Sequence, residues 1–367
     1  DFISSNNPND IKLMTPTYLA SHPTDNEIYW GEEGSGKIRK VNRITGTVTE
    51  VLGLSRSHQD QDMQIPADIY NYYIRGLSFH NNQLMYVDRY NSWTTNRGCR
   101  VKLYNDSGSS STFFGTTIND GLIGIIAGNW TKGCGNWEDL VGEQATSVKL
   151  KGPEAAVSDG TNMYITNAYA HCILKVDASG VISQFSGDCN SAGDVTGIIG
   201  SGSIRYSYPS ALAMDTEYPG NMFVVDRSTS SSSSYIKYIN QSASNIKVAG
   251  TTVAAGEVAN IFTTAGYTGS IATFGNWICY NSTYFLGYTN NSKSNVNCID
   301  RTNTLGAVGF RVGNSNSDSI LGGRQVGSEY EGVDSMAMRL ANPLGLTFDS
   351  DGNLYIAETV GHTIKMV

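Results

Sequence analysis

Four carboxylates stand at similar places in the chain, each directly after a short apolar run. They are Glu32, Asp88, Asp226 and Glu358, and Asn167 follows a fifth such run. If the five runs converge on one opening, these oxygens could together hold Ca²⁺, which takes about 6–8 oxygen ligands. In the alternative interpretation, each side chain accepts hydrogen bonds from the backbone of its own loop. The residue types are compatible with either role.

Aromatic and basic residues gather just beyond these acids. Tyr, Trp and Arg are the preferred anchors of binding surfaces, and aromatic faces also stack on sugars. The candidate ligand-binding residues are Arg89, Tyr90, Trp93, Trp130, Trp137, Tyr169, His171, Arg227, Tyr288 and His362. The two tryptophans at 130 and 137 have a second interpretation, because they flank Cys134 and could fill a small core within their own loop.

No catalytic constellation is visible in the sequence. None of the 5 histidines belongs to an HxxxH or HExxH pair, and there is no Gly-x-Ser-x-Gly segment. We therefore name no catalytic residue, and enzymatic activity is left open but is not favoured.

The 6 cysteines are even in number and none forms a CxxC pair, which argues against zinc or thioredoxin-like chemistry. Of the fifteen pairings that six cysteines allow, we expect the sequential one, because each bridge would clamp an enlarged loop. The expected disulfides are Cys99–Cys134, Cys172–Cys189 and Cys279–Cys298. The alternative is six buried free thiols in a reducing compartment.

The composition excludes several classes of protein. The chain has 367 residues, 40 Gly, 16% charged residues and a net charge of −8. It lacks the Leu, Ala, Glu and Lys of a helical enzyme, while Tyr, Val, Ile and Gly suit strands and tight turns. There is no basic stripe for nucleic acid, and no apolar segment reaches the length of a membrane helix. Paired cysteines favour a secreted or cell-surface protein, and the start at Asp1 suggests a mature fragment or an excised domain.

The chain repeats one unit six times. The clearest copy runs from Asn342 to Val367 and reads as strand, Asp351-Gly352-Asn353 turn, strand, loop, strand. The middle strands align at Tyr29, Met85, Tyr164, Phe223, Phe285 and Tyr355. A fourth strand is expected after the first five copies, at residues 47–52, 121–127, 181–185, 245–249 and 307–312.

These units predict an all-β, six-bladed β-propeller of four-stranded antiparallel blades, formed by residues 1–367 as a single domain. The last copy ends with the chain and has no fourth strand of its own. We therefore expect Phe2–Ser4 to complete the blade formed by residues 343–367, which would close the ring and protect its sheet edge.

The last copy resembles the NHL repeat. The resemblance lies in Gly345, Asp349, Gly352-Asn353-Leu354-Tyr355-Ile356-Ala357-Glu358 and His362-Thr-Ile-Lys365, and it is strong also in the copy around Tyr164. It implies a six-bladed propeller. It also implies an alternative function, because some propellers of this type are lyases with a histidine-bound metal in the axial channel; His171 and His362 occupy similar positions in their copies.

The leading functional hypothesis is an extracellular recognition or adhesion module. It would bind a glycan or a protein on a cell surface through one face and its enlarged loops, without nucleic acid or membrane insertion. It would form the head of a larger bacterial surface or secreted protein, attached to a fibre or to other domains. The alternatives are a metal-dependent lyase or hydrolase acting in the axial channel, and a structural oligomerisation module. No cofactor is assigned, apart from the Ca²⁺ alternative in the channel.

Overall fold

The computed structural model describes most of the chain. The described residues are 4–5, 11–53, 63–69, 71, 73–89, 98–129, 134–135, 142–229, 233–285, 291–303, 308–312, 319–320 and 340–367.

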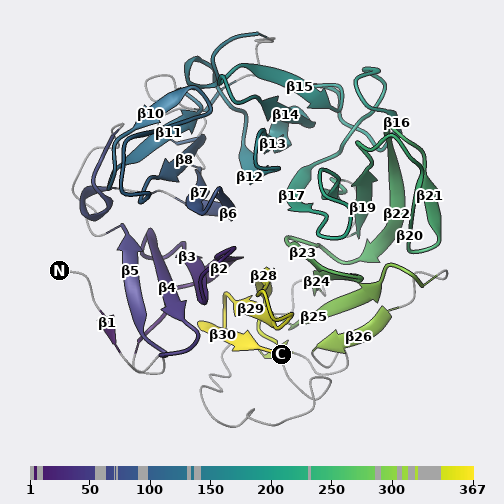
Figure 1. Ribbon diagram of the computed structural model, residues 1–367. Coiled ribbons are helices and arrows are strands. Elements are labelled where there is room, and N and C mark those ends of the chain that lie inside the picture. The colour runs from purple at the N-terminus through teal and green to yellow at the C-terminus, as the bar shows by residue number, and fades with distance from the viewer. Residues whose placement is uncertain are drawn as a thin grey trace.

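The strands form a ring of six antiparallel sheets around an axis (Figure 1), so the predicted all-β, six-bladed fold is confirmed. Blade 1 contains β2 (Pro16–Ser21), β3 (Glu27–Glu32), β4 (Lys37–Asn42) and β5 (Val48–Leu52), with β1 (Ser4–Ser5) at its outer edge. Blade 2 contains β6 (Ile74–His80), β7 (Gln83–Asp88), β8 (Arg100–Tyr104) and β11 (Ile123–Ala127). Blade 3 contains β12 (Pro153–Ser158), β13 (Met163–Asn167), β14 (Cys172–Val176) and β15 (Ile182–Ser186).

The second half of the ring follows the same order. Blade 4 contains β17 (Pro209–Met214), β18 (Met222–Arg227), β19 (Ser233–Ile239) and β22 (Glu257–Ala265), with β16 (Gly197–Ile198) outside them. Blade 5 contains β23 (Ile271–Phe274), β24 (Trp277–Phe285), β25 (Asn291–Asp300) and β26 (Val308–Val312), and β27 (Ser319–Ile320) also pairs with β25. Blade 6 contains β28 (Pro343–Phe348), β29 (Leu354–Glu358) and β30 (Thr363–Met366).

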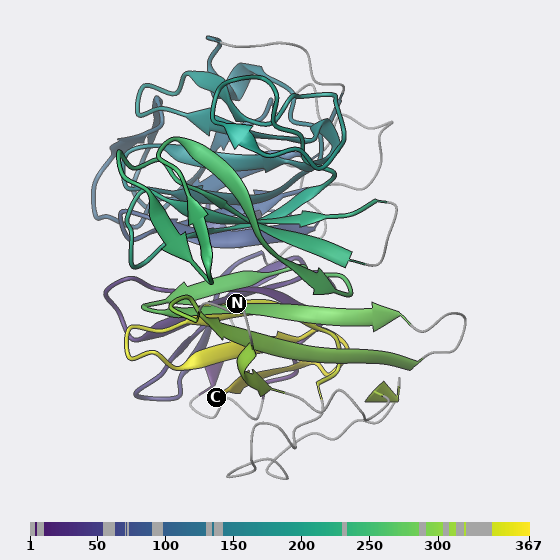
Figure 2. The same cartoon turned by 90° about the vertical axis from the view of Figure 1, so that its right-hand side faces the viewer.

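Strands run across the thickness of the ring, as β24 and β25 do in Figure 2. Because each blade is antiparallel, its turns alternate between the two faces of the ring. We call the side with the loops between second and third strands, and the connections between blades, the loop face. The opposite side is the hairpin face. Among the described residues, the short 3₁₀ turns Pro66–Asp68, Ala145–Ser147 and Ala168–Ala170 lie in the loops and connections.

The core consists of six apolar clusters, one between each pair of neighbouring blades. Two of them are enlarged by hairpins inserted between the third and fourth strands. The hairpin of β9 (Ser111–Phe113) and β10 (Thr116–Ile118) packs between blades 2 and 3. The hairpin of β20 (Ile246–Val248) and β21 (Thr251–Val253) packs between blades 4 and 5.

Counted over the described residues, the smallest cluster closes the ring between blades 6 and 1. Its buried members are Leu19, Ile28, Trp30, Val48, Tyr355 and Ala357. Polar contacts supplement this seam. On the hairpin face, Arg43 Nη1 lies 2.6 Å from the buried Asp349 Oδ2 and 2.9 Å from Asp351 Oδ2. On the loop face, the Thr359 hydroxyl donates to the Pro16 carbonyl over 3.0 Å. The seam is therefore held by side chains rather than by a shared strand.

The N-terminal strand does not complete the last blade, which corrects one prediction. Ser4 pairs with Thr49 of β5 in blade 1, and blade 6 has three strands among the described residues. The entering segment is already attached to blade 1, where Arg39 Nη1 donates to the Lys12 carbonyl over 3.2 Å. Leu13 packs in the closing cluster nearby. The free outer edge of β5 therefore receives β1.

Two predicted strand positions also need correction. In blade 5, Phe274 pairs with Trp277 across a two-residue turn, so the middle strand begins at Trp277, ahead of the segment aligned at Phe285. In blade 4, residues 246–248 pair with β21, and the fourth strand is β22. The fourth strands predicted for blades 1, 2, 3 and 5 are confirmed within one or two residues.

The three predicted disulfides are present: Cys99–Cys134, Cys172–Cys189 and Cys279–Cys298. The first two link the start of a third strand to a later connection. The third does not clamp a loop as expected, because Cys279 and Cys298 lie directly opposite each other on β24 and β25.

Among the described residues, no helix is long and apolar enough to cross a membrane.

Replacing Arg43 with Ala should lower the free energy of unfolding by about 1–3 kcal/mol, since the buried Asp349 loses a charged hydrogen-bond partner at the seam between blades 6 and 1. Urea unfolding followed by tryptophan fluorescence measures the change. The matched control is Ile44→Ala, because Ile44 is the next residue and 77% exposed; its effect should stay within about 0.5 kcal/mol. Equal stability of the Arg43 variant and the parent would contradict this account of ring closure.

Removing the Cys172–Cys189 bridge by a paired change to Ala should cost about 3 kcal/mol, because the unfolded chain regains the freedom of a 17-residue loop. Thermal and urea unfolding of parent and variant provide the comparison. The oxidised state itself is checked by thiol labelling in denaturant. No thiol should react before reductant is added, and labelling of six would refute the bridges.

Candidate functional site

The four candidate acids lie at the ends of second strands, and each is buried against a cation from the third strand of its own blade. The closest distances are 2.9 Å for Glu32–Arg39, 2.7 Å for Asp88–Lys102, 3.0 Å for Asp226–Lys237 and 2.9 Å for Glu358–Lys365. Burial raises the pKa of Asp226 above its usual value, although Lys237 opposes this effect. The carboxylates are therefore engaged within their blades.

Asp226 and Glu358 also accept backbone hydrogen bonds, from the connection that enters the blade rather than from their own loop. The Tyr208 N–H donates to Asp226 Oδ1 over 2.8 Å, and the Ala341 N–H donates to Glu358 Oε1 over 2.9 Å. Asn167 Oδ1 accepts from Lys151 N–H over 2.6 Å in the same way. The described residues contain no group of three or more His, Cys, Asp or Glu side chains placed to hold a metal. The structure thus does not bring the Ca²⁺ candidates together.

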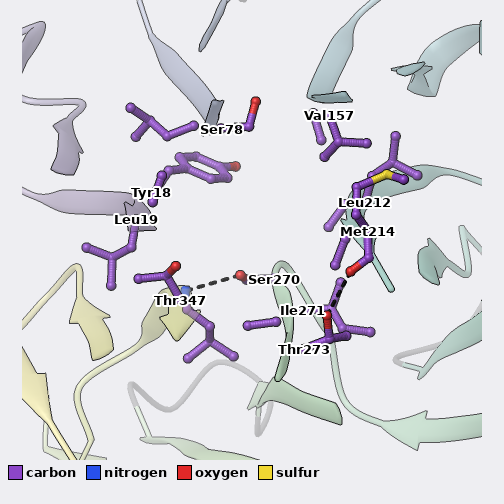
Figure 3. Close-up of a pocket in the computed structure, with 18 of the residues that line it drawn as sticks. Tyr18, Leu19, Ser78, Val157, Leu212, Met214, Ser270, Ile271, Thr273 and Thr347 are labelled. Atoms are coloured by element: carbon purple, nitrogen blue, oxygen red, sulfur yellow. Dashed lines mark hydrogen bonds between the residues drawn. The ribbon is translucent and has the colours of Figure 1, made fainter. Parts of the chain in front are cut away.

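The axial channel forms a cavity of about 400 Å³ lined by the first strands of all six blades (Figure 3). Its wall is made of small and apolar residues with a few hydroxyl groups, among them Tyr18, Ser78 and Thr273. No acid, histidine, cysteine or basic residue belongs to the lining formed by the described residues. This wall can hold water or a small uncharged molecule, but it supplies neither metal ligands nor an acid–base pair.

His171 and His362 both precede third strands and both have positive φ angles, 65° and 53°. Each bonds to the segment that leads into the next blade. His171 Nδ1 donates to the Ser207 carbonyl over 2.7 Å, whereas His362 Nδ1 accepts from the Thr15 N–H over 3.0 Å. These bonds tie blade 3 to blade 4 and blade 6 to blade 1. Their Nδ1 atoms thus have structural partners, and a ligand contact by either histidine stays a prediction.

Three predicted ligand residues, Arg89, Tyr169 and Arg227, come together on the loop face. They belong to a continuous polar and aromatic cluster across blades 1 to 5, which we call the loop-face network. Its members are Tyr18, Glu33, Arg75, Arg89, Glu154, Tyr169, Tyr208, Arg227 and Tyr267. The channel and the network meet at Tyr18, which points into the channel in Figure 3 and accepts a hydrogen bond from Arg75 Nη1.

Glu154, the second residue of β12, is the centre of this network. It forms a close ion pair with Arg89 and accepts a hydrogen bond from the Tyr208 hydroxyl. Its other oxygen lies 3.9 Å from Arg75 Nε. Arg89 also donates to the Tyr169 hydroxyl over 2.9 Å, with its guanidinium 4.9 Å from that ring. Burial, followed by the charge of Glu154, raises the pKa of Tyr208, so its hydroxyl stays protonated and able to donate.

Sequence reasoning missed Arg75, Glu154, Tyr208 and Tyr267. Arg75 and Glu154 lie on first strands, which the repeat pattern treats as channel wall, and the two tyrosines lie on connections into blades. A signal was available in the Gly152-Pro153-Glu154 and Tyr208-Pro209 segments, because the prolines mark where the chain enters a blade. Five other predicted ligand residues, Tyr90, Trp93, Trp130, Trp137 and Tyr288, lie outside the described residues.

Comparisons with known proteins support the fold alone. No family model matches the chain, and no curated protein matches it. A solved gluconolactonase from Xanthomonas campestris has a TM-score of 0.53 at 11% identity, covering 97% of this chain and 86% of the other. A streptogramin B lyase has a TM-score of 0.50 at 13% identity, covering 100% and 97%. The chain is thus similar in fold to these proteins, while membership of the NHL family stays a prediction.

Replacing Glu154 with Ala should destabilise the protein by about 3–5 kcal/mol, because two arginines lose the carboxylate that neutralises them in a buried setting. The matched control is Glu33→Ala. Glu33 also pairs with Arg75, over 3.0 Å, but it is 22% exposed and pairs with one arginine rather than two, so its loss should cost less than the loss of Glu154. Urea unfolding ranks the two variants, and equal effects would show that Glu154 is not the centre of the network.

Proposed function

We propose that this protein is an extracellular recognition module that binds a glycan or protein ligand through its loop face. The observation that carries the proposal is the loop-face network, which places three arginines and four tyrosines side by side across five blades. Such residues combine flat apolar surface with hydrogen-bonding tips, and they lose little conformational entropy on binding.

The setting of the network supports the same function. Arg89 and Tyr169 are held by Glu154 and Tyr208 in the absence of ligand, so part of the cost of ordering a binding surface is already met. The connection at residues 187–208 is fixed by Cys172–Cys189 at its start, and β16 within it pairs with the outer strand of blade 4. Rigid loops on a rigid ring are the arrangement that recognition proteins use repeatedly. Three disulfides are consistent with a secreted or surface-exposed protein.

The metal-dependent lyase or hydrolase alternative needs ligands in the axial channel. The lining formed by the described residues offers hydroxyl and backbone groups only, and hydroxyls alone are poor ligands for zinc. An oligomerisation module would instead bind copies of itself, which size-exclusion chromatography with light scattering detects. Recognition of another molecule is the hypothesis that uses the features of the loop face.

A glycan array and a panel of extracellular matrix proteins, probed with the purified chain, test the proposal. We expect the parent to bind at least one ligand, and Tyr169→Ala and the pair Trp130→Ala/Trp137→Ala to weaken that binding at least about tenfold, as hot-spot side chains do. Ile44→Ala is the control, since Ile44 is exposed on the hairpin face. A parent that binds nothing, or a control as weak as the tyrosine and tryptophan variants, would count against the proposal.

A further inference from the structure

Arg227 differs from the other two arginines of the loop-face network. Its guanidinium lies between two tyrosine rings, 5.4 Å from the centre of Tyr208 and 5.0 Å from that of Tyr267. Arg75 and Arg89 both form ion pairs with carboxylates. Arg227 has no ion pair with any described residue, and its Nε atom is buried without a hydrogen-bond acceptor there.

The charges within the network make this arginine the exception. The two positive charges of Arg75 and Arg89 are balanced by the two negative charges of Glu33 and Glu154, which contact them. The charge of Arg227 is left over. The chain that follows it, Ser228-Thr229-Ser230-Ser231-Ser232-Ser233-Ser234, contains no acid. Among the described members of the loop-face network, Arg227 is thus the cation without a carboxylate partner.

The geometry favours a planar anion. The Arg227 guanidinium lies over both rings, and because its Nε is buried, the terminal Nη groups are the donors that a ligand could reach. A carboxylate can accept two parallel hydrogen bonds from these groups. The rings that hold the guanidinium are themselves partly exposed, so each can contact the body of a ligand whose carboxylate is bound to Arg227.

We propose that Arg227 is the anchor for the carboxylate of an acidic sugar, which Tyr208 and Tyr267 flank. The inference rests on the proposed recognition function and names the class of ligand. A sugar suits the site better than an acidic peptide, because aromatic rings flank Arg227 and sugar rings stack on aromatic faces. Tyr208 and Tyr267 supply these rings.

Isothermal titration calorimetry with tetragalacturonic acid and 3′-sialyllactose, against tetragalacturonic acid methyl ester and lactose, tests the inference on the full chain. We expect at least one acidic sugar to bind and its uncharged counterpart to bind about 10- to 100-fold more weakly, as the loss of a charged hydrogen-bonded pair predicts. Arg227→Ala should remove this preference, whereas Arg227→Lys should keep part of it. The two acidic sugars distinguish a uronic acid from a sialic acid.

The control is Lys247→Ala, which removes the same charge from an exposed position on β20, on the hairpin face. If it weakens binding as much as Arg227→Ala, the effect is one of net charge and the inference is wrong. It is also wrong if charged and uncharged sugars bind equally or if no acidic sugar binds. Tetraglutamate is titrated as an acidic peptide, and binding of this peptide alone through Arg227 would likewise contradict the inference. In these cases a ligand found on the array still supports recognition, whereas a parent that binds no ligand contradicts the proposed function itself.

Discussion

Face-to-face packing of apolar sheets is the interaction on which this molecule depends. A blade satisfies most backbone groups within its own sheet, but both of its faces are apolar and must be covered by neighbours. A ring is the arrangement in which no blade has a bare face. Among the described residues, the seam between blades 6 and 1 has the smallest apolar cluster of the six interfaces. It also brings together strands more than 300 residues apart in the sequence. Its polar ties, led by Arg43–Asp349, compensate for that small cluster.

Closing the ring also buries backbone groups that need hydrogen-bond partners, which explains why the buried acids of the repeat have a structural role. A second strand that ends under the loop face leaves the backbone N–H of the entering connection in need of an acceptor. Asp226, Glu358 and Asn167 each accept from it. A buried carboxylate also needs a cation, and a lysine or arginine of the third strand supplies it. Blade 3 shows that the ion pair is dispensable. There the neutral Asn167 accepts the backbone hydrogen bond, and Leu174 occupies the position of Lys237 in blade 4.

Much of the fold follows from local sequence. The turn at Asp349–Asn353 can be recognised from its Asp-Gly-Asn sequence. In the structure, Asp349 accepts hydrogen bonds from two backbone N–H groups of this turn, and Gly352 has a φ of 87°. The features that could not be predicted depend on distant partners. Residues 246–248 have the composition of a blade strand, but they form an inserted hairpin because its apolar side fits between blades 4 and 5. The pairing of Ser4 with Thr49 likewise depends on where the entering chain is anchored.

The candidate site, too, could be predicted only where it depends on local sequence and not where it depends on distant partners. The repeat alignment locates loop residues such as Arg89, Tyr169 and Arg227, because they follow recognisable second strands. It cannot show that a glutamate on a first strand lies beneath them, since Glu154 is 65 residues from Arg89 in sequence.

The two faces of the ring use different groups to hold neighbouring blades together. On the hairpin face, Arg301 pairs with Asp215 across blades 4 and 5 just as Arg43 pairs with Asp349 across blades 6 and 1. Both arginines therefore form ion pairs that hold neighbouring blades together. On the loop face, the corresponding structural work is done by buried acids, backbone groups and histidine Nδ1 atoms. Arg89 also contributes there through its ion pair with Glu154 of the next blade. Arg227 at the end of β18 takes no part in an ion pair among the described residues, and its side-chain contacts there are with aromatic rings.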